Sequence, residues 1–124
     1  MCSRAELDGL LAELAEGAKE IFNDKLKDVI LFGSYARGDY DSESDVNIAV
    51  LADIKRGEER KYSKQLIDII GDIYEKYGYP VLLAPIVISA DFFEEWKNSM
   101  PFYRNITKEG VSVLGKNTSL RGNS

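Results

Sequence analysis

The feature that most constrains the fold is a pair of apolar runs on either side of one polar, glycine-containing segment. Residues 29–32 read Val-Ile-Leu-Phe, and residues 46–51 read Val-Asn-Ile-Ala-Val-Leu. Short apolar runs bounded by turn residues are typical of buried β-strands. We therefore expect two strands of one sheet, joined by a polar loop over residues 33–45.

This loop and the start of the second strand carry residues suited to binding a phosphate and a cation. Gly33 lets the backbone approach a ligand or adopt a positive φ, and Ser34 stands where a short helix can begin. Backbone N–H groups at such a position can point at a phosphate, and Arg37 would add a positive charge. Asp45 and Asn47 are two residues apart on a strand, so their side chains share one face. That face is a candidate cation site.

At these residues the chain resembles the polymerase-beta-type nucleotidyltransferase superfamily, in particular its minimal, single-domain (MNT-like) antitoxin subgroup. The family pattern is Gly-Ser, a short spacer with Arg-Gly, and then Asp-x-Asp on the next strand. Residues 33–47 read GSYARGDYDSESDVN, so only Asn47 departs from the pattern. The similarity extends to Pro-Phe-Tyr-Arg-Asn-Ile at residues 101–106 and so covers most of the chain.

The resemblance implies a function and a role for each motif residue. The family transfers a nucleoside monophosphate from an NTP, with ATP as the expected donor, to a hydroxyl group and releases pyrophosphate. Family members of this size often act as antitoxins that modify a helical HEPN-type partner protein, so such a partner is implied. The implied nucleotide-binding residues are Gly33, Ser34, Arg37 and Gly38. The implied catalytic residues, which are also the Mg²⁺ ligands, are Asp45 and Asn47.

Two features of the sequence leave the degree of catalytic activity open. Asn47 offers a carbonyl oxygen but no negative charge, and it cannot accept a proton at neutral pH. The family's third carboxylate usually comes from a strand that corresponds to residues 80–88, yet no Asp or Glu occurs between Lys76 and Ala90. Either substrate phosphates and water complete the Mg²⁺ shell, or the chain has weak or no catalysis. In the second case it binds a partner through its aromatic region at residues 92–102, or it senses nucleotide.

Each motif residue also has a purely structural interpretation. Gly33 and Ser34 can form a simple strand-to-helix turn, and Arg37 can form a surface salt bridge to Asp39 or Asp41. Asp45 can cap the loop, while Asn47 can bond to the loop backbone. Further acidic residues in the loop favour a solvated turn over metal ligands. These are Asp39, Asp41 and Glu43.

The rest of the chain predicts an α/β fold with a small mixed β-sheet and helices mainly on one face, as in nucleotidyltransferases. Apolar spacing predicts long helices over residues 7–21 and 57–77, and Ser89 can cap a short helix that ends near Trp96. Further predicted elements are a strand over 80–88, in which Pro85 favours a sheet edge, a helix over 102–106 and a strand over 111–114. We expect a single domain over 1–115 and a flexible tail over 116–124.

Composition narrows the classes of function and of location. The 124 residues are 44% hydrophobic and 30% charged, which is ordinary for a globular protein. A net charge of −5 disfavours binding to duplex nucleic acid. No apolar stretch is long enough for a membrane span. We expect a cytoplasmic protein, because the chain has a single cysteine and lacks a signal-peptide pattern. Because the chain has no histidine, histidine bases and histidine metal sites are excluded.

Overall fold

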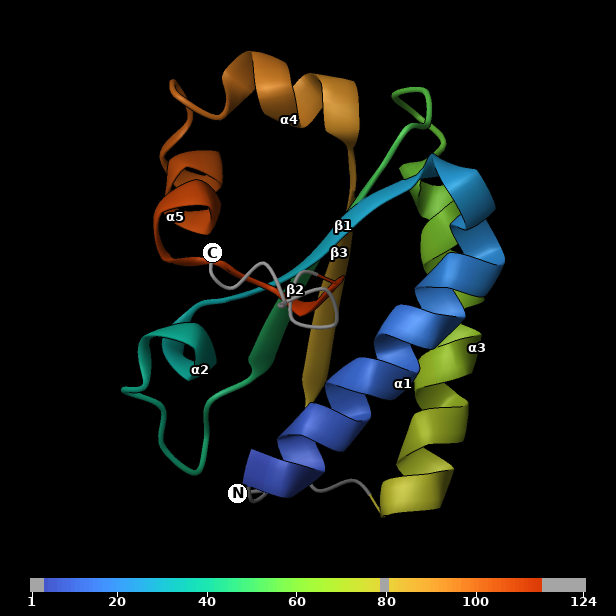
Figure 1. Ribbon diagram of the computed structural model, residues 1–124, viewed down its shortest axis with the longest axis vertical. Helices are drawn as coiled ribbons and strands as arrows, with labels where there is room; N and C mark the ends of the chain where they lie inside the picture. The colour runs from blue at the N-terminus through green and yellow to red at the C-terminus, as the bar shows by residue number, and fades with distance from the viewer. Residues whose placement is uncertain (1–3, 79–80, 115–124) are drawn as a thin grey trace.

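The computed structural model describes residues 4–78 and 81–114 and contains a mixed β-sheet (Figure 1). The strand order in this four-stranded sheet is β3-β2-β1-β4. β2 and β3 are parallel, whereas β1 is antiparallel to both β2 and β4. The predicted small mixed sheet is therefore confirmed. The strands are β1 (Leu26–Phe32), β2 (Val46–Ala52), β3 (Leu83–Ser89) and β4 (Val111–Ser112).

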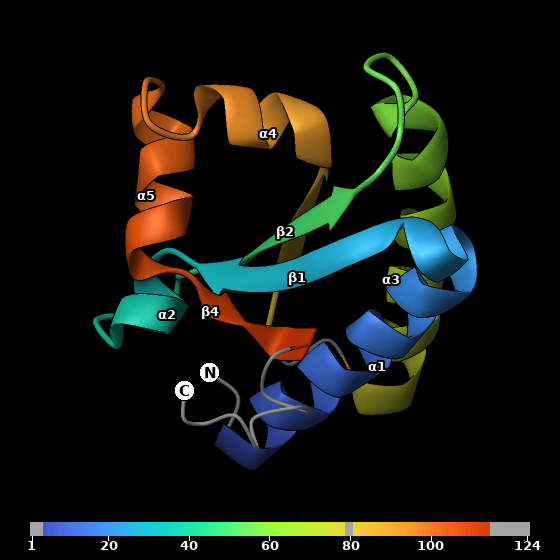
Figure 2. The ribbon, with the colours of Figure 1, turned by 45° about the horizontal axis from the view of Figure 1, so that its top comes forward.

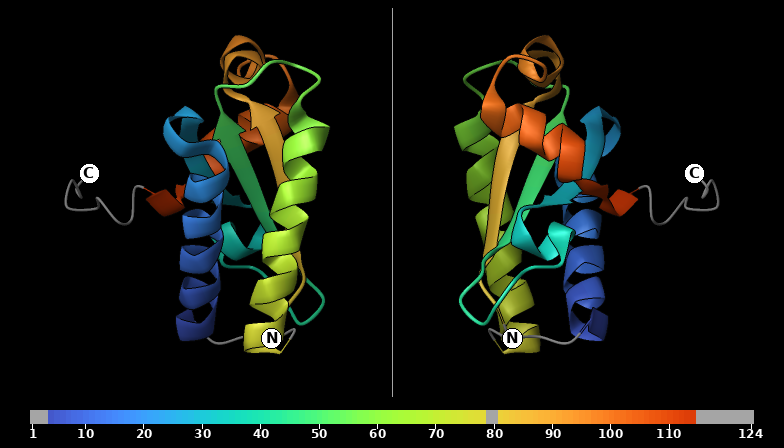
Figure 3. Two further views of the ribbon diagram at one scale, coloured as in Figure 1. Left: turned by 90° about the vertical axis from the view of Figure 1, so that its right-hand side faces the viewer. Right: turned by 90° about the vertical axis from the view of Figure 1, so that its left-hand side faces the viewer.

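Two long helices, α1 (Arg4–Phe22) and α3 (Glu59–Tyr77), lie side by side across one face of the sheet (Figures 1 and 3). The shorter helices lie at the ends of strands and on the opposite face. They are the 3-10 turn η1 (Asn23–Lys25), α2 (Ser34–Arg37), α4 (Ala90–Trp96) and α5 (Pro101–Glu109). The expectation that helices lie mainly on one face of an α/β fold is thus confirmed for the long helices.

The main core fills the space between the sheet and these two long helices. Leu10 and Leu14 of α1 are fully buried there, and each fully buried leucine stabilises the fold by about 1.5–3 kcal/mol. A Cβ on Gly17 would lie only 2.7 Å from Cγ2 of Ile69, so the absence of a side chain lets α1 and α3 approach closely.

A smaller core lies on the other face of the sheet, under α4 and α5. Its buried residues are Phe32, Ala49, Leu51, Ile88, Phe93 and Ile106. Side chains alternate between the two faces along a strand, and Ile48 and Val50 belong to the main core. Asn47 therefore lies on the same side of β2 as α4 and α5.

Several boundaries coincide with local signals, of which the Ser89 cap and the edge position of β3 were predicted. Ser89 caps α4 by accepting a hydrogen bond from the Phe92 N–H, and Pro101 is at the start of α5. Gly110 ends α5. β3, which contains Pro85, is an edge strand, as expected for a residue that cannot donate to a neighbouring strand.

Other boundaries differ from the prediction. β1 begins at Leu26 instead of Val29, because Leu26 pairs with Ala52 beyond an irregularity in the register. β4 stops at Ser112, so the strand predicted over 111–114 is shorter. The predicted tail over 116–124 lies outside the described residues. Within residues 4–78 and 81–114, no helix combines the length and apolar character needed to cross a membrane.

Candidate active site

The predicted Gly-Ser loop forms a tight connection between β1 and α2. Gly33 follows the last residue of β1 and has φ 81° and ψ −158°, a conformation that favours glycine. One helical turn follows, and the N–H of Gly38 donates to the Ser34 carbonyl oxygen at 2.8 Å. Gly38 has φ 92°, so it also uses the freedom of glycine to end this turn.

The pairing of β1 with β2 brings Asn47 to this loop. Phe32, the last residue of β1, is the register partner of Asn47. A Cβ on Gly33 would lie 2.6 Å from Nδ2 of Asn47, so the two residues are in direct contact. Asn47 is half-buried, and Asp45 is exposed immediately before β2 begins. The Gly-Ser turn and the Asp-x-Asn segment therefore meet at one end of the sheet.

Arg37 at the end of α2 is held by two carboxylates. Its Nε donates to Oδ2 of Asp39 at 3.2 Å, and its Nη1 donates to Oε1 of Glu109 at 2.9 Å. The hydrogen bond to Asp39 and the negative charges of both partners raise the pKa of Arg37. A surface salt bridge from Arg37 to Asp39 or Asp41 was the purely structural alternative predicted for this arginine, and the one to Asp39 is present. The ion pair with Glu109 was not predicted.

Glu109 also binds the loop backbone. Its Oε1 accepts a hydrogen bond from the Gly33 N–H at 3.2 Å, so one oxygen joins the start and the end of the Gly33–Arg37 turn. Figure 2 shows how the end of α5 reaches α2 beside β4. No local pattern predicts this contact, because Glu109 lies 76 residues beyond Gly33.

The acidic residues of the loop form a turn, as predicted. Oδ1 of Asp41 accepts hydrogen bonds from the Glu43 N–H at 2.9 Å and from Oγ of Ser44 at 3.3 Å. Tyr40 stacks on the buried ring of Tyr35, with ring centres 4.1 Å apart. These contacts fix the segment that leads from α2 to Asp45.

The metal donors at this end of the sheet are limited. The β3 residue beside Asn47 is Ala84, which has no polar side chain. In the described part of the chain, no group of three or more His, Cys, Asp or Glu side chains is placed to hold a metal ion. Mg²⁺ commonly uses one or two carboxylates together with substrate phosphates and water. With so few donors, Asp45 and Asn47 could contribute ligands only to an ion that also uses substrate phosphates and water.

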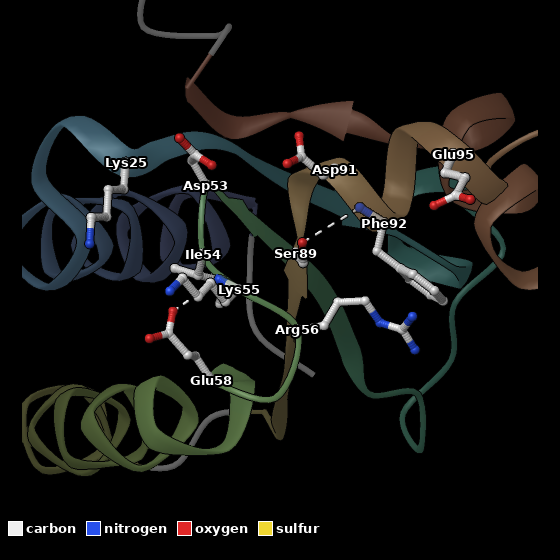
Figure 4. Close-up of a pocket in the computed structure, with 10 residues that line it drawn as sticks. All are labelled: Lys25, Asp53, Ile54, Lys55, Arg56, Glu58, Ser89, Asp91, Phe92 and Glu95. Atoms are coloured by element: carbon white, nitrogen blue, oxygen red, sulfur yellow. Dashed lines mark hydrogen bonds between the residues drawn. The ribbon is translucent and has the colours of Figure 1, made fainter.

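A recess of about 460 Å³ lies at the opposite end of the sheet (Figure 4). The recess is close to the ends of β2 and β3. Arg56 and Phe92 line it, and the Arg56 guanidinium lies 4.1 Å from the centre of the Phe92 ring. Its charged lining residues have both signs, which gives no clear complementarity to a triphosphate. They are Lys25, Asp53, Lys55, Arg56, Glu58, Asp91 and Glu95. On chemical grounds, the Gly33 end remains the candidate active site.

The matching family model and two sequence relatives agree with the motif. The family model described as "Nucleotidyltransferase domain" matches residues 11–112. Two Methanocaldococcus jannaschii proteins are similar to this chain. "Putative protein adenylyltransferase MJ0604" is 35% identical over 81% of this chain and 90% of its own length. "Putative protein adenylyltransferase MJ0141" is 38% identical over 75% of this chain and 94% of its own length. A crystal structure of a toxin-antitoxin with AMP-PNP is 17% identical, with a TM-score of 0.47 over 83% of this chain and 71% of that chain.

Proposed function

The chain belongs to the nucleotidyltransferase domain family, and we propose that it transfers a nucleoside monophosphate from an NTP, ATP by preference, to a hydroxyl group on a partner protein. One observation carries this proposal: the contact between Gly33 and Asn47 places the Gly-Ser turn beside the Asp-x-Asn segment. The relatives named as protein adenylyltransferases support ATP as the donor and a protein as the acceptor.

The residues of the loop are suited to the nucleotide phosphates. The Ser34 hydroxyl, the loop backbone and the Arg37 guanidinium would bind phosphate oxygens, with Gly33 and Gly38 allowing the chain to turn tightly around them. Phosphoryl transfer depends mostly on positioning and on stabilising negative charge at these oxygens.

Asp45 and Asn47 would hold the Mg²⁺ that the family resemblance implies, and the chemistry supplied there would be the neutralisation of phosphate charge. Asp45 is the only one of the two that carries a negative charge. Removal of its carboxylate should consequently have a larger effect than removal of the Asn47 amide.

An exposed apolar surface that runs from α4 to α5, and that reaches the site at Phe102, is suited to the partner protein. Trp96 and Met100 are each 38% exposed, and Phe102 is 44% exposed. The Phe102 ring lies edge-on to Phe32 with centres 5.6 Å apart, and Phe32 is the register partner of Asn47. A helical HEPN-type partner, of the kind the resemblance implies, could dock here and bring its hydroxyl group towards Asp45.

A second candidate function is partner binding or nucleotide sensing with weak or absent catalysis. The observation that favours it is the pairing of Asn47 with Ala84, which leaves this part of β3 without a carboxylate. A nucleotide sensor should bind MgATP without releasing pyrophosphate, and Ser34→Ala should weaken that binding.

The distinguishing experiment measures transfer of labelled AMP from ATP to protein in a cell lysate with Mg²⁺. We expect the native chain to label a polypeptide and Asp45→Ala to abolish that label. Asp68→Ala, an exposed change on α3, is the matched control and should retain it. Labelling that persists in Asp45→Ala would refute the proposed site. If only Asn47→Asp is active, the second candidate function is favoured.

A further inference from the structure

We infer that Glu109 is a positioning residue of the nucleotide site, which holds the Gly33 turn and the Arg37 guanidinium in the arrangement that receives phosphates. This inference rests on the proposed function and extends the site to α5. The Gly-Ser and Asp-x-Asn motifs contain no residue from that helix.

The geometry around one carboxylate oxygen of Glu109 supports this role. Oε1 of Glu109 accepts from the Gly33 N–H at 3.2 Å and from Nη1 of Arg37 at 2.9 Å. The Arg37 Nε bonds to Asp39, so two contacts on different nitrogens fix the plane of the guanidinium. A guanidinium has further N–H groups beyond these two, and they remain able to bind phosphate oxygens.

The backbone at Glu109 is anchored to β1, the strand that leads into the loop. The Gly110 N–H donates to the Ile106 carbonyl oxygen at 2.9 Å. A Cβ on Gly110 would lie 2.5 Å from Cγ2 of Ile30, so the end of α5 packs tightly on β1. Val111 then pairs with Leu31. The position of the carboxylate is therefore set by elements outside the loop.

A positioning role for Glu109 differs from competition with the nucleotide for Arg37. If the Glu109 carboxylate competed with the nucleotide phosphates for Arg37, it would have to leave Arg37 before the phosphates bind. The Glu109 side chain is 24% exposed, whereas that of Arg37 is 46% exposed. The Arg37 side chain therefore presents a larger fraction of its surface to solvent than the Glu109 side chain does. Phosphates can approach Arg37 from solvent while Glu109 stays in place.

The test titrates MgATP into the native chain, Glu109→Ala, Glu109→Gln, Arg37→Ala and the Glu109→Ala/Arg37→Ala double variant. We expect Glu109→Ala to bind about 10-fold more weakly, because a hydrogen bond to a charged group is lost. Glu109→Gln should be intermediate, because its amide oxygen can still accept from Gly33. In the Arg37→Ala background, Glu109→Ala should weaken binding by less than it does in the native chain, because Glu109 acts in part through Arg37 and in part through Gly33. Glu75→Gln, on the exposed surface of α3, is the charge-matched control.

A purely structural role would lower the melting temperature and give additive effects in the double variant, and that result would overturn the inference. Unchanged or tighter binding by Glu109→Ala would also overturn it, while leaving the proposed function intact. If the native chain binds no MgATP, both the proposed function and the inference fail. Should Glu109→Ala not fold, weaker binding by Glu109→Gln supports the inference, and unchanged or tighter binding refutes it.

Discussion

Gly33 and Asn47 fit against each other so closely that a Cβ on Gly33 would lie 2.6 Å from Nδ2 of Asn47. Gly33 opens the loop proposed to bind phosphates, and Asn47 lies on the strand proposed to hold the metal. This contact links the two halves of the candidate site, so a change at either residue should be felt at the other.

Gly33→Ala should destabilise the fold by about 2 kcal/mol or more, because alanine is strained at φ 81° and its methyl group would meet Asn47. Denaturant unfolding measures this loss. Combining the change with Asn47→Ala should recover the part due to the clash. Gly71→Ala is the control, since no atom lies within 4 Å of a Cβ there, and it should stabilise the chain by about 0.5–1 kcal/mol. A native-like stability for Gly33→Ala would contradict the prediction.

Asn47→Asp should raise the affinity for MgATP. A second carboxylate beside Asp45 adds about 1 kcal/mol or more of attraction to a cation in a solvated site, which is about a 5-fold change in affinity. Calorimetric titration with MgATP and with ATP in chelator separates the contribution of the metal. An equal gain in the presence of chelator would argue against metal binding at position 47.

The local features of this site were predictable from sequence because they depend on neighbouring residues. Gly33 and Ser34 between two apolar runs predicted the strand, turn and short helix that the structure contains. Pro85 predicted an edge strand for the same kind of reason. The roles assigned to Asp45, Asn47 and the loop residues in binding and catalysis stay predictions.

What the sequence did not reveal depends on long-range packing. Glu109 reaches Gly33 only because α5 and β4 return to β1, and a single glutamate before a glycine carries no sign of that contact. The early start of β1 at Leu26 likewise depends on pairing with Ala52 and not on a local apolar pattern.

Tyr40→Ala should loosen the segment between α2 and β2. The ring of Tyr40 stacks on Tyr35 at 4.1 Å, and such pairs contribute about 0.5–1.5 kcal/mol beyond the area that they bury. Hydrogen exchange of the amides at residues 38–44 should become faster. Tyr40→Phe keeps the stacked ring and should exchange like the native chain. Equal protection in the alanine variant would show that the stack does not order the loop.

Tyr103 should make the fold less stable at high pH. Burial, and to a smaller extent the nearby Glu59, raise the pKa of its phenol, while Arg56 opposes the shift. Because the pKa is raised in the folded chain, the protonated phenol contributes to the stability of the fold below about pH 10, the ordinary tyrosine value. This contribution is lost as the pH rises through the pKa of the folded chain. Unfolding free energies measured from pH 9 to 11 should fall less steeply in Tyr103→Phe. Identical slopes would rule out a contribution from this phenol.

The location of nucleotide binding is best tested by mapping the backbone amide resonances of the native chain during titration with MgATP. The proposed site predicts that the largest shifts occur at Gly33, Ser34, Arg37 and Asn47. The recess at the other end of the sheet supplies the alternative, marked by Arg56, Ser89 and Phe92. Shifts concentrated there, or no shifts at saturating MgATP, would contradict a nucleotide site formed by the Gly-Ser turn and the Asp-x-Asn segment.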